Sequence, residues 1–104
     1  MRFLLVTKPK TMPPLDMILP LIDAMDAWVK KYKQAGKLEQ MWGFAGLQGG
    51  GGIGNVVSLE ELDQVMAEFP VGPFSDIQIY YLVDLEKSLE QNRKIFQAMA
   101  APKS

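Results

Sequence analysis

The sequence predicts an α+β fold built on one antiparallel sheet, and three observations lead to that prediction. Short apolar runs typical of strands alternate with longer segments whose apolar residues recur every three or four positions. Two strand-like segments in the middle of the chain are joined by a glycine-rich stretch. The 104 residues contain no linker, repeat or low-complexity boundary, so we expect a single domain over residues 1–104.

The chain begins with a predicted strand and a predicted amphipathic helix. Arg2 to Lys8 is continuously apolar at its centre, which is typical of a strand covered on both faces. Between Leu15 and Gln34 the apolar residues recur at helical spacing, with acidic residues early and basic residues late, as the helix dipole favours. Pro20 lies inside this pattern, so we expect either a later helix start or a kink.

The middle of the chain predicts a hairpin. Lys37 to Leu47 is the expected second strand and Ile53 to Val57 the third, and six of the nine glycines lie between Gly46 and Gly54. Because glycine inside a strand costs conformational entropy and packs no side chain, this run is predicted to be a flexible turn. A backbone approached closely by a substrate or a neighbouring subunit is the alternative. An anion cradle is a minor alternative, since the P-loop lysine and hydroxyl are missing.

The second helix has a clear start and a clear end. Ser58 and Glu61 form a capping box, in which each side chain satisfies a free backbone donor of the other residue. Apolar residues then follow at helical spacing until Pro70, which ends the helix.

The last third of the chain predicts one more strand and a terminal helix. Asp76 to Val83 is the expected fourth strand, in which Tyr80 and Tyr81 point to opposite faces. Asp84 is expected to cap the third helix, and residues 100–104 to fray. The order β-α-β-β-α-β plus a helix is the ferredoxin-like arrangement, which leaves one face of a four-stranded sheet open for a second subunit.

Composition excludes several classes of function. The chain has no cysteine and no histidine, which removes disulfides, thiolate nucleophiles, serine–histidine pairs and the usual zinc or haem ligands. A net charge of −1 argues against a nucleic-acid surface. No apolar run approaches the ~20 residues that span a bilayer, so we expect a cytoplasmic protein that does not bind membranes.

The aromatic residues suit a flat organic ligand, although a core or a subunit interface would use the same residue types. The candidates for substrate binding are Trp28, Tyr32, Trp42, Phe44, Phe74 and Tyr80, and Tyr81 belongs to the same aromatic set. Asn55 is a further candidate, because its amide could orient an oxyanion, and a turn role is its alternative. We expect a pocket between the sheet and its helices, lined by Trp28, Trp42, Phe44 and Tyr80.

Without histidine and cysteine, carboxylates are the main candidates for proton transfer. Glu39 and Asp76 are the predicted catalytic residues, since a carboxylate in an apolar cleft has the raised pKa that a proton shuttle needs. Asp76 follows a proline-rich turn and could instead cap that turn. Asp63 and Glu68 are expected to be solvated residues on a helix surface.

Three blocks in register resemble the muconolactone isomerase family. They are Met41–Gly46, Val57–Leu62 and Phe69–Ile77, and the most family-like set is Pro70, Pro73, Asp76 and Ile77. The resemblance implies a small ferredoxin-like subunit that assembles through its sheets as a dimeric α+β barrel, as a homodimer or a higher homo-oligomer. It also implies an enzyme without cofactor or metal that shifts a double bond by moving a proton in a small lactone acid.

Three hypotheses for function follow. The first is a cofactor-independent isomerase or cyclase that acts on a small lactone or aromatic organic acid. The second is a cofactor-free monooxygenase, like those of antibiotic biosynthesis that share this barrel. The third is a non-catalytic oligomer that binds a small molecule.

Overall fold

The computed structural model describes residues 1–46 and 48–101. In chain order the elements are β1 (Arg2–Pro9), α1 (Leu15–Gln34), β2 (Leu38–Gly43), β3 (Gly50–Asn55), α2 (Leu59–Ala67), the 3₁₀ turn η1 (Gly72–Phe74), β4 (Ser75–Tyr81) and α3 (Leu85–Ala100). This order confirms the predicted ferredoxin-like arrangement with a terminal helix. The predicted end of the second strand at Leu47 and the predicted tail beyond residue 101 lie outside the described residues.

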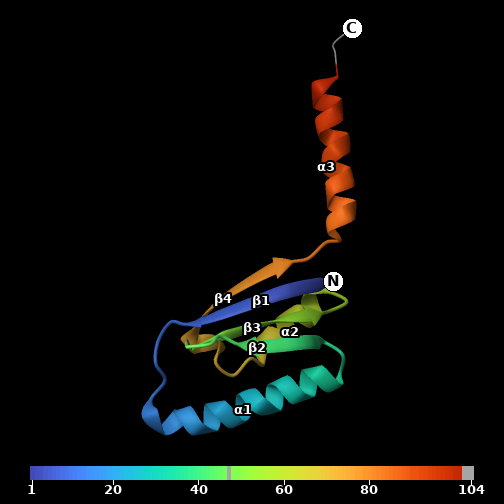
Figure 1. The fold of residues 1–104 in the computed structure, drawn as a ribbon. Coiled ribbons are helices and arrows are strands. Elements are labelled where there is room, and N and C mark those ends of the chain that lie inside the picture. Colours follow the sequence, from blue (N-terminus) through green and yellow to red (C-terminus); the bar gives the residue numbers. More distant parts are fainter. Residues whose placement is uncertain (47, 102–104) are drawn as a thin grey trace.

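The four strands form one antiparallel sheet in the order β2-β3-β1-β4. Both α1 and α2 lie on one face of the sheet, here called the inner face, and neither covers the opposite, outer face (Figure 1). Alternate residues of β1 point to the two faces. Phe3, Leu5 and Thr7 are buried on the inner face, whereas Leu4 and Val6 on the outer face are only half-buried. The apolar run of β1 is therefore covered on one face within the single chain.

The core occupies one end of the layer between helices and sheet. Its buried apolar residues are Phe3, Leu5, Trp28, Tyr32, Leu38, Val56, Leu62, Val65 and Phe69. Trp28 joins the two helices, because its indole nitrogen donates to the Val65 carbonyl at 3.0 Å. Its ring also lies 4.9 Å from the ring of Phe69 between centroids. A polar contact and an aromatic contact thus fix the C-terminal half of α1 against α2.

Helix α1 begins at Leu15, directly after Pro14, and continues as one element through Pro20. The predicted alternative of a later start is therefore wrong. Both buried residues of α1, Trp28 and Tyr32, belong to its C-terminal half. The N-terminal half exposes large apolar side chains, among them Leu15 and Leu19. Packing therefore fixes this helix at one end only.

The glycine run is a strand, which corrects the prediction that it forms the turn. Strand β3 contains Gly50, Gly51, Gly52 and Gly54, and the connection from β2 precedes them. A Cβ atom would lie 2.3 Å from the Trp42 carbonyl oxygen at Gly50 and 2.4 Å from the Leu5 carbonyl oxygen at Gly51. At Gly52 it would lie 2.4 Å from the Gln40 carbonyl oxygen. The close approach is made by the two neighbouring strands, so glycine is the residue that fits between them.

Helix α3 stands apart from the rest of the fold (Figure 1). The Asp84 side chain accepts a hydrogen bond from the Lys87 backbone at 2.9 Å, which confirms the predicted cap. None of the residues of α3 is buried. The Cα radius of gyration is 18.6 Å, whereas a compact chain of this length has about 13 Å. The molecule is elongated because this helix has no packing partner within the described part of the chain.

The glycine strand leads to a stability prediction. Replacing Gly50 by alanine should lower the free energy of unfolding by about 1–3 kcal/mol, because the new methyl group meets backbone that cannot move aside. Gly43 lies opposite Gly50 in the register and has open space where its Cβ would be. Gly43→Ala is therefore the matched control and should leave stability unchanged or slightly raised. Urea denaturation of both variants tests this, and equal midpoints would contradict it.

Candidate functional site

A cavity of about 770 Å³ lies between the N-terminal half of α1 and the inner face of the sheet. Its helix side is formed by apolar residues such as Ile18, Leu21 and Met25. Its sheet side includes Thr7 and the glycines at positions 49–51. Cavities of this size are typical of sites for small organic ligands.

Two features of the fold create this cavity. The core fixes the C-terminal half of α1 through Trp28 and Tyr32, while the N-terminal half contributes no buried residue. Opposite that half, β3 offers glycines in place of side chains that would fill the space. The register aligns Pro9 with Ser75 and Thr7 with Gly50, so the ends of β1, β3 and β4 meet here. Figure 1 shows the β1–α1 connection and the β2–β3 hairpin at this same end of the sheet.

The lining is mostly apolar and carries few polar groups. Among the described lining residues, Lys10 is the single charged side chain. The Thr7 hydroxyl donates to the Gly50 carbonyl at 3.2 Å, and the Ser75 hydroxyl donates to the Val71 carbonyl at 2.8 Å. Thr11 and Gln48 are the other polar residues of the lining. A bound ligand would thus meet apolar surface and a single cationic group.

The structure brings together three of the predicted aromatic residues. Trp42, Phe44 and Phe74 line the cavity. Trp28 does not, because its ring is buried in the core against Phe69. Tyr32 is also buried outside the cavity lining. The predicted pocket between sheet and helices therefore exists, with Trp28 and Tyr80 missing from its wall.

Tyr80 and Asp76 lie on the outer face of the sheet. Their partners in β1 are Leu4 and Lys8, which alternate with the buried inner-face residues. The Tyr80 hydroxyl donates to the Gln78 side chain at 3.1 Å, and Asp76 lines a smaller cavity with Lys8 and Gln78. Tyr81 takes the inner-face position opposite Phe3, as the predicted alternation requires. The catalytic role of Asp76 stays a prediction, and this residue lies across the sheet from the main cavity.

Glu39 is an exposed residue of the edge strand β2, outside the cavity lining. One of its carboxylate oxygens accepts from two nitrogens of the Arg2 guanidinium, at 2.8 and 3.1 Å. Its catalytic role also stays a prediction. The sequence analysis did not identify Lys10. Its position directly after the first strand was a usable signal, because the ferredoxin-like order brings the end of that strand close to the glycine hairpin.

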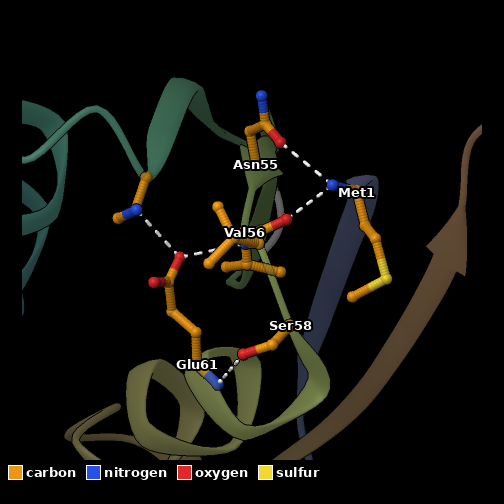
Figure 2. Close-up of polar contacts among 7 residues, drawn as sticks. Met1, Asn55, Val56, Ser58 and Glu61 are labelled. Atoms are coloured by element: carbon orange, nitrogen blue, oxygen red, sulfur yellow. Dashed lines mark hydrogen bonds and ion pairs between the residues drawn. The ribbon is translucent and has the colours of Figure 1, made fainter.

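Asn55 holds the start of the chain (Figure 2). The N-terminal ammonium of Met1 donates to the Asn55 side chain at 3.3 Å and to the Val56 carbonyl at 2.5 Å. Asn55 is outside the lining of the cavity, so its position matches a structural role. Nearby, the Ser58 hydroxyl accepts from the Glu61 backbone at 3.1 Å. The Glu61 carboxylate accepts from the Val57 backbone at 3.2 Å, one residue earlier than the predicted capping box requires.

Tyr32 and Glu68 form a polar clasp between α1 and the end of α2. The buried Tyr32 hydroxyl donates to the Glu68 carboxylate, which also pairs with Lys31 at 2.9 Å. Burial, together with the carboxylate, raises the pKa of Tyr32. The hydrogen bond from Tyr32, followed by the one from Lys31, lowers the pKa of Glu68. Glu68 is exposed, as the sequence predicted, and its pairing with Tyr32 and Lys31 also stabilises the fold.

Comparison with known proteins identifies related sequences and folds. The family model of muconolactone delta-isomerase matches residues 2–87. The crystal structure of a muconolactone isomerase is similar with a TM-score of 0.73 and 20% identity, covering 81% of this chain and 90% of that one. A 5-chloro-2-hydroxyhydroquinone dehydrochlorinase from Burkholderia phenoliruptrix AC1100, in complex with 2,5-dihydroxybenzoquinone, is similar with a TM-score of 0.63 and 16% identity. That match covers 84% of this chain and 98% of the dehydrochlorinase.

These comparisons have clear bounds. At 20% and 16% identity the two structures establish a shared fold. A comparison with curated proteins gives no match. The matched region of the family model ends at residue 87, near the start of α3, so most of that helix lies beyond it. In the described part of the chain, no helix has the length and hydropathy to cross a membrane.

The Tyr32–Glu68 clasp predicts how stability depends on pH. The lowered pKa of Glu68 means that its stabilising effect is complete above the unfolded-state pKa and is lost as pH falls through the folded-state value. Glu68→Gln should therefore lower Tm at neutral pH, and the difference from the unmodified protein should shrink in acid. The exposed Asp63, changed to Asn, is the control. A Tm difference that does not change with pH would contradict the role of this carboxylate.

Proposed function

Because the chain belongs to the muconolactone delta-isomerase family, we propose that it is a cofactor-independent isomerase that moves a proton within an organic acid bound in the 770 Å³ cavity. One observation carries this proposal. A largely apolar cavity of ligand size has Lys10 as the single charged side chain of its described lining. Such a site suits a ligand with an apolar body and a polar end.

The proposed chemistry assigns the proton to Lys10. The Lys10 side-chain nitrogen takes a proton from a carbon next to the ligand carbonyl, the double bond shifts, and the same nitrogen returns the proton to another carbon. The reaction needs no oxidant and leaves the number of atoms and electrons unchanged. Thr11 and Gln48 line the same cavity, and they supply hydrogen-bond donors for the carbonyl oxygen, where negative charge develops.

The substrate is proposed to be a lactone or an aromatic organic acid. Phe44 and Phe74 give the cavity aromatic surface, which favours a flat ring. The similar dehydrochlorinase is complexed with 2,5-dihydroxybenzoquinone, itself a flat ring, which supports the same class. Glu39 and Asp76 lie outside this lining, so Lys10 takes the role that the sequence predicted for a carboxylate.

Proton transfer can be measured without knowing the natural substrate. Unsaturated lactone acids and arylacetic acids, incubated with the protein in D₂O, should exchange the hydrogen next to the carbonyl, as followed by proton NMR. Lys10→Met should lower the exchange rate by about 100-fold or more, the usual range for a lost general base. Lys8→Met is the matched control, because Lys8 lies on the outer face away from the cavity, and its rate should be unchanged.

The outcomes separate this proposal from its alternatives. Binding of the acids without any exchange would identify a non-catalytic binding protein. Oxygen uptake with an anthrone-type phenol would identify a monooxygenase. Equal rates for Lys10→Met and Lys8→Met would remove Lys10 from the mechanism.

A second experiment tests the cavity itself. Met25 lines the cavity from α1, and a tryptophan in its place should fill much of the space. Met25→Trp should weaken binding of 1-naphthoate, a flat aromatic acid, by about tenfold or more, since the ligand loses most of its buried surface. Met17→Trp is the control, because Met17 is exposed on the same helix outside the lining. Fluorescence titration measures both, and equal affinities would place the ligand elsewhere.

A further inference from the structure

Helix α3 carries an apolar stripe that no other residue in the described part of the chain buries. Its apolar side chains are 55–74% exposed. Four of them, together with the polar Asn92, follow the pattern Leu85, Leu89, Asn92, Phe96, Met99, with alternating steps of four and three residues, and Ile95 lies at the edge of this stripe. The alternating steps match the a/d seam of a two-helix coiled coil.

An isolated helix of this length has little stability of its own. Helices shorter than about 12–15 residues are marginal in water, and the 16 residues of α3 only just exceed that length. A stripe of exposed leucine, phenylalanine and methionine adds an unfavourable contact with water. A packing partner outside the chain would remove both problems.

We propose that α3 pairs with α3 of a second copy of this chain, in antiparallel orientation. The charges on the helix favour this orientation over a parallel one. Its first half carries Glu86, Lys87 and Glu90, so two negative charges and one positive charge leave it acidic by one, whereas its second half carries Arg93 and Lys94. Antiparallel pairing places the acidic half of one helix beside the basic half of the other, whereas parallel pairing places like charges side by side. The two helix dipoles also oppose each other in the antiparallel pair.

The segment just before α3, residues 81–83, supplies a second surface for the same partner. Tyr81, Leu82 and Val83 directly precede α3 and are exposed, Val83 by 77%. Helix α3 projects away from the sheet beyond the end of β4 (Figure 1). The C-terminal end of an antiparallel partner helix would therefore lie near residues 81–83. Phe96 and Met99 of each copy would then cover the exposed residues 81–83 of the other copy. One twofold axis satisfies both apolar surfaces, as in an isologous dimer.

The middle of the seam contains a polar residue, Asn92. An asparagine within an apolar seam costs stability but disfavours other registers and larger bundles, because its amide needs a polar partner. In the antiparallel pair this residue lies near the twofold axis. Asn92 therefore limits the assembly through α3 to two helices in one register.

The first experiment measures the mass of the full-length protein in solution by sedimentation equilibrium. Leu89→Asp combined with Phe96→Asp should raise the dissociation constant of the α3 contact by about 100-fold or more, because carboxylates would be buried in an apolar seam. Gln91→Asp combined with Gln97→Asp adds the same charge outside the stripe and is the matched control. Circular dichroism and thermal unfolding check that the sheet domain stays folded.

The outcome is decisive in either direction. A control that keeps the mass of the unmodified protein, with a seam variant that falls to a smaller species, supports the pairing. A monomeric unmodified protein, or a seam variant with unchanged mass, would overturn it. An assembly made solely through the outer faces of the sheets gives the second of these results.

The orientation is tested by cross-linking, which is straightforward because the chain has no cysteine. Leu85→Cys mixed with Phe96→Cys or Met99→Cys should give a mixed disulfide in at least one of the two mixtures, since antiparallel helices bring opposite ends together. Leu85→Cys alone should give none. A disulfide in Leu85→Cys alone, without mixed products, would establish parallel helices and overturn the proposed orientation.

Discussion

The close approach of three strand backbones around β3 is the constraint on which the rest of this structure depends. At Gly50, Gly51 and Gly52 the neighbouring carbonyl oxygens of β1 and β2 occupy the space that any Cβ atom would need. The strand therefore contributes hydrogen bonds to the sheet and no side-chain volume on its inner face, where Gly50, Gly52 and Gly54 lie. Its inner surface has no side chains to fill the space beneath the N-terminal half of α1, so a cavity forms there instead of a core.

The other end of the layer must compensate for this missing packing. Trp28 and Tyr32 fix α1 to α2 through the Val65 carbonyl and the Glu68 carboxylate, and both rings are buried. The two features act together. The packed C-terminal half holds α1 in place, and the glycines of β3 leave space beneath its N-terminal half. The helix does not need to be strained for the cavity to exist. The cavity therefore results from the residues that occupy β3 and α1, and the ferredoxin-like topology does not change.

The fold was predictable from the sequence because its signals are local. The Ser58 cap, the helical spacing after Leu15 and the proline at position 70 each act within a few residues of the feature they determine. The glycine strand was not predictable, because the reason for its glycines is the position of backbone carbonyls on the two neighbouring strands, that of Leu5, distant in sequence, and that of Trp42, across the hairpin. Trp42, Phe44 and Phe74 line the cavity and Trp28 and Tyr32 lie in the core, and the sequence alone could not tell these two sets apart. Aromatic residues suit cores and pockets equally well, and only packing decides between the two.

The same glycines that open the cavity also restrict its chemistry. The inner face of β3 carries only glycines and cannot supply an acid, a base or a charge to the floor of a site, so reactive groups have to come from the segments around it. Lys10 meets this requirement, because it directly follows β1 and its backbone is fixed by a 2.9 Å hydrogen bond to the Phe74 carbonyl. The carboxylates of Glu39 and Asp76 do not meet it, since one is paired with Arg2 and the other points to the outer face. Any catalysis in this cavity therefore depends on groups in the connections at one end of the sheet, where a single substitution can change the reaction while the strands stay the same.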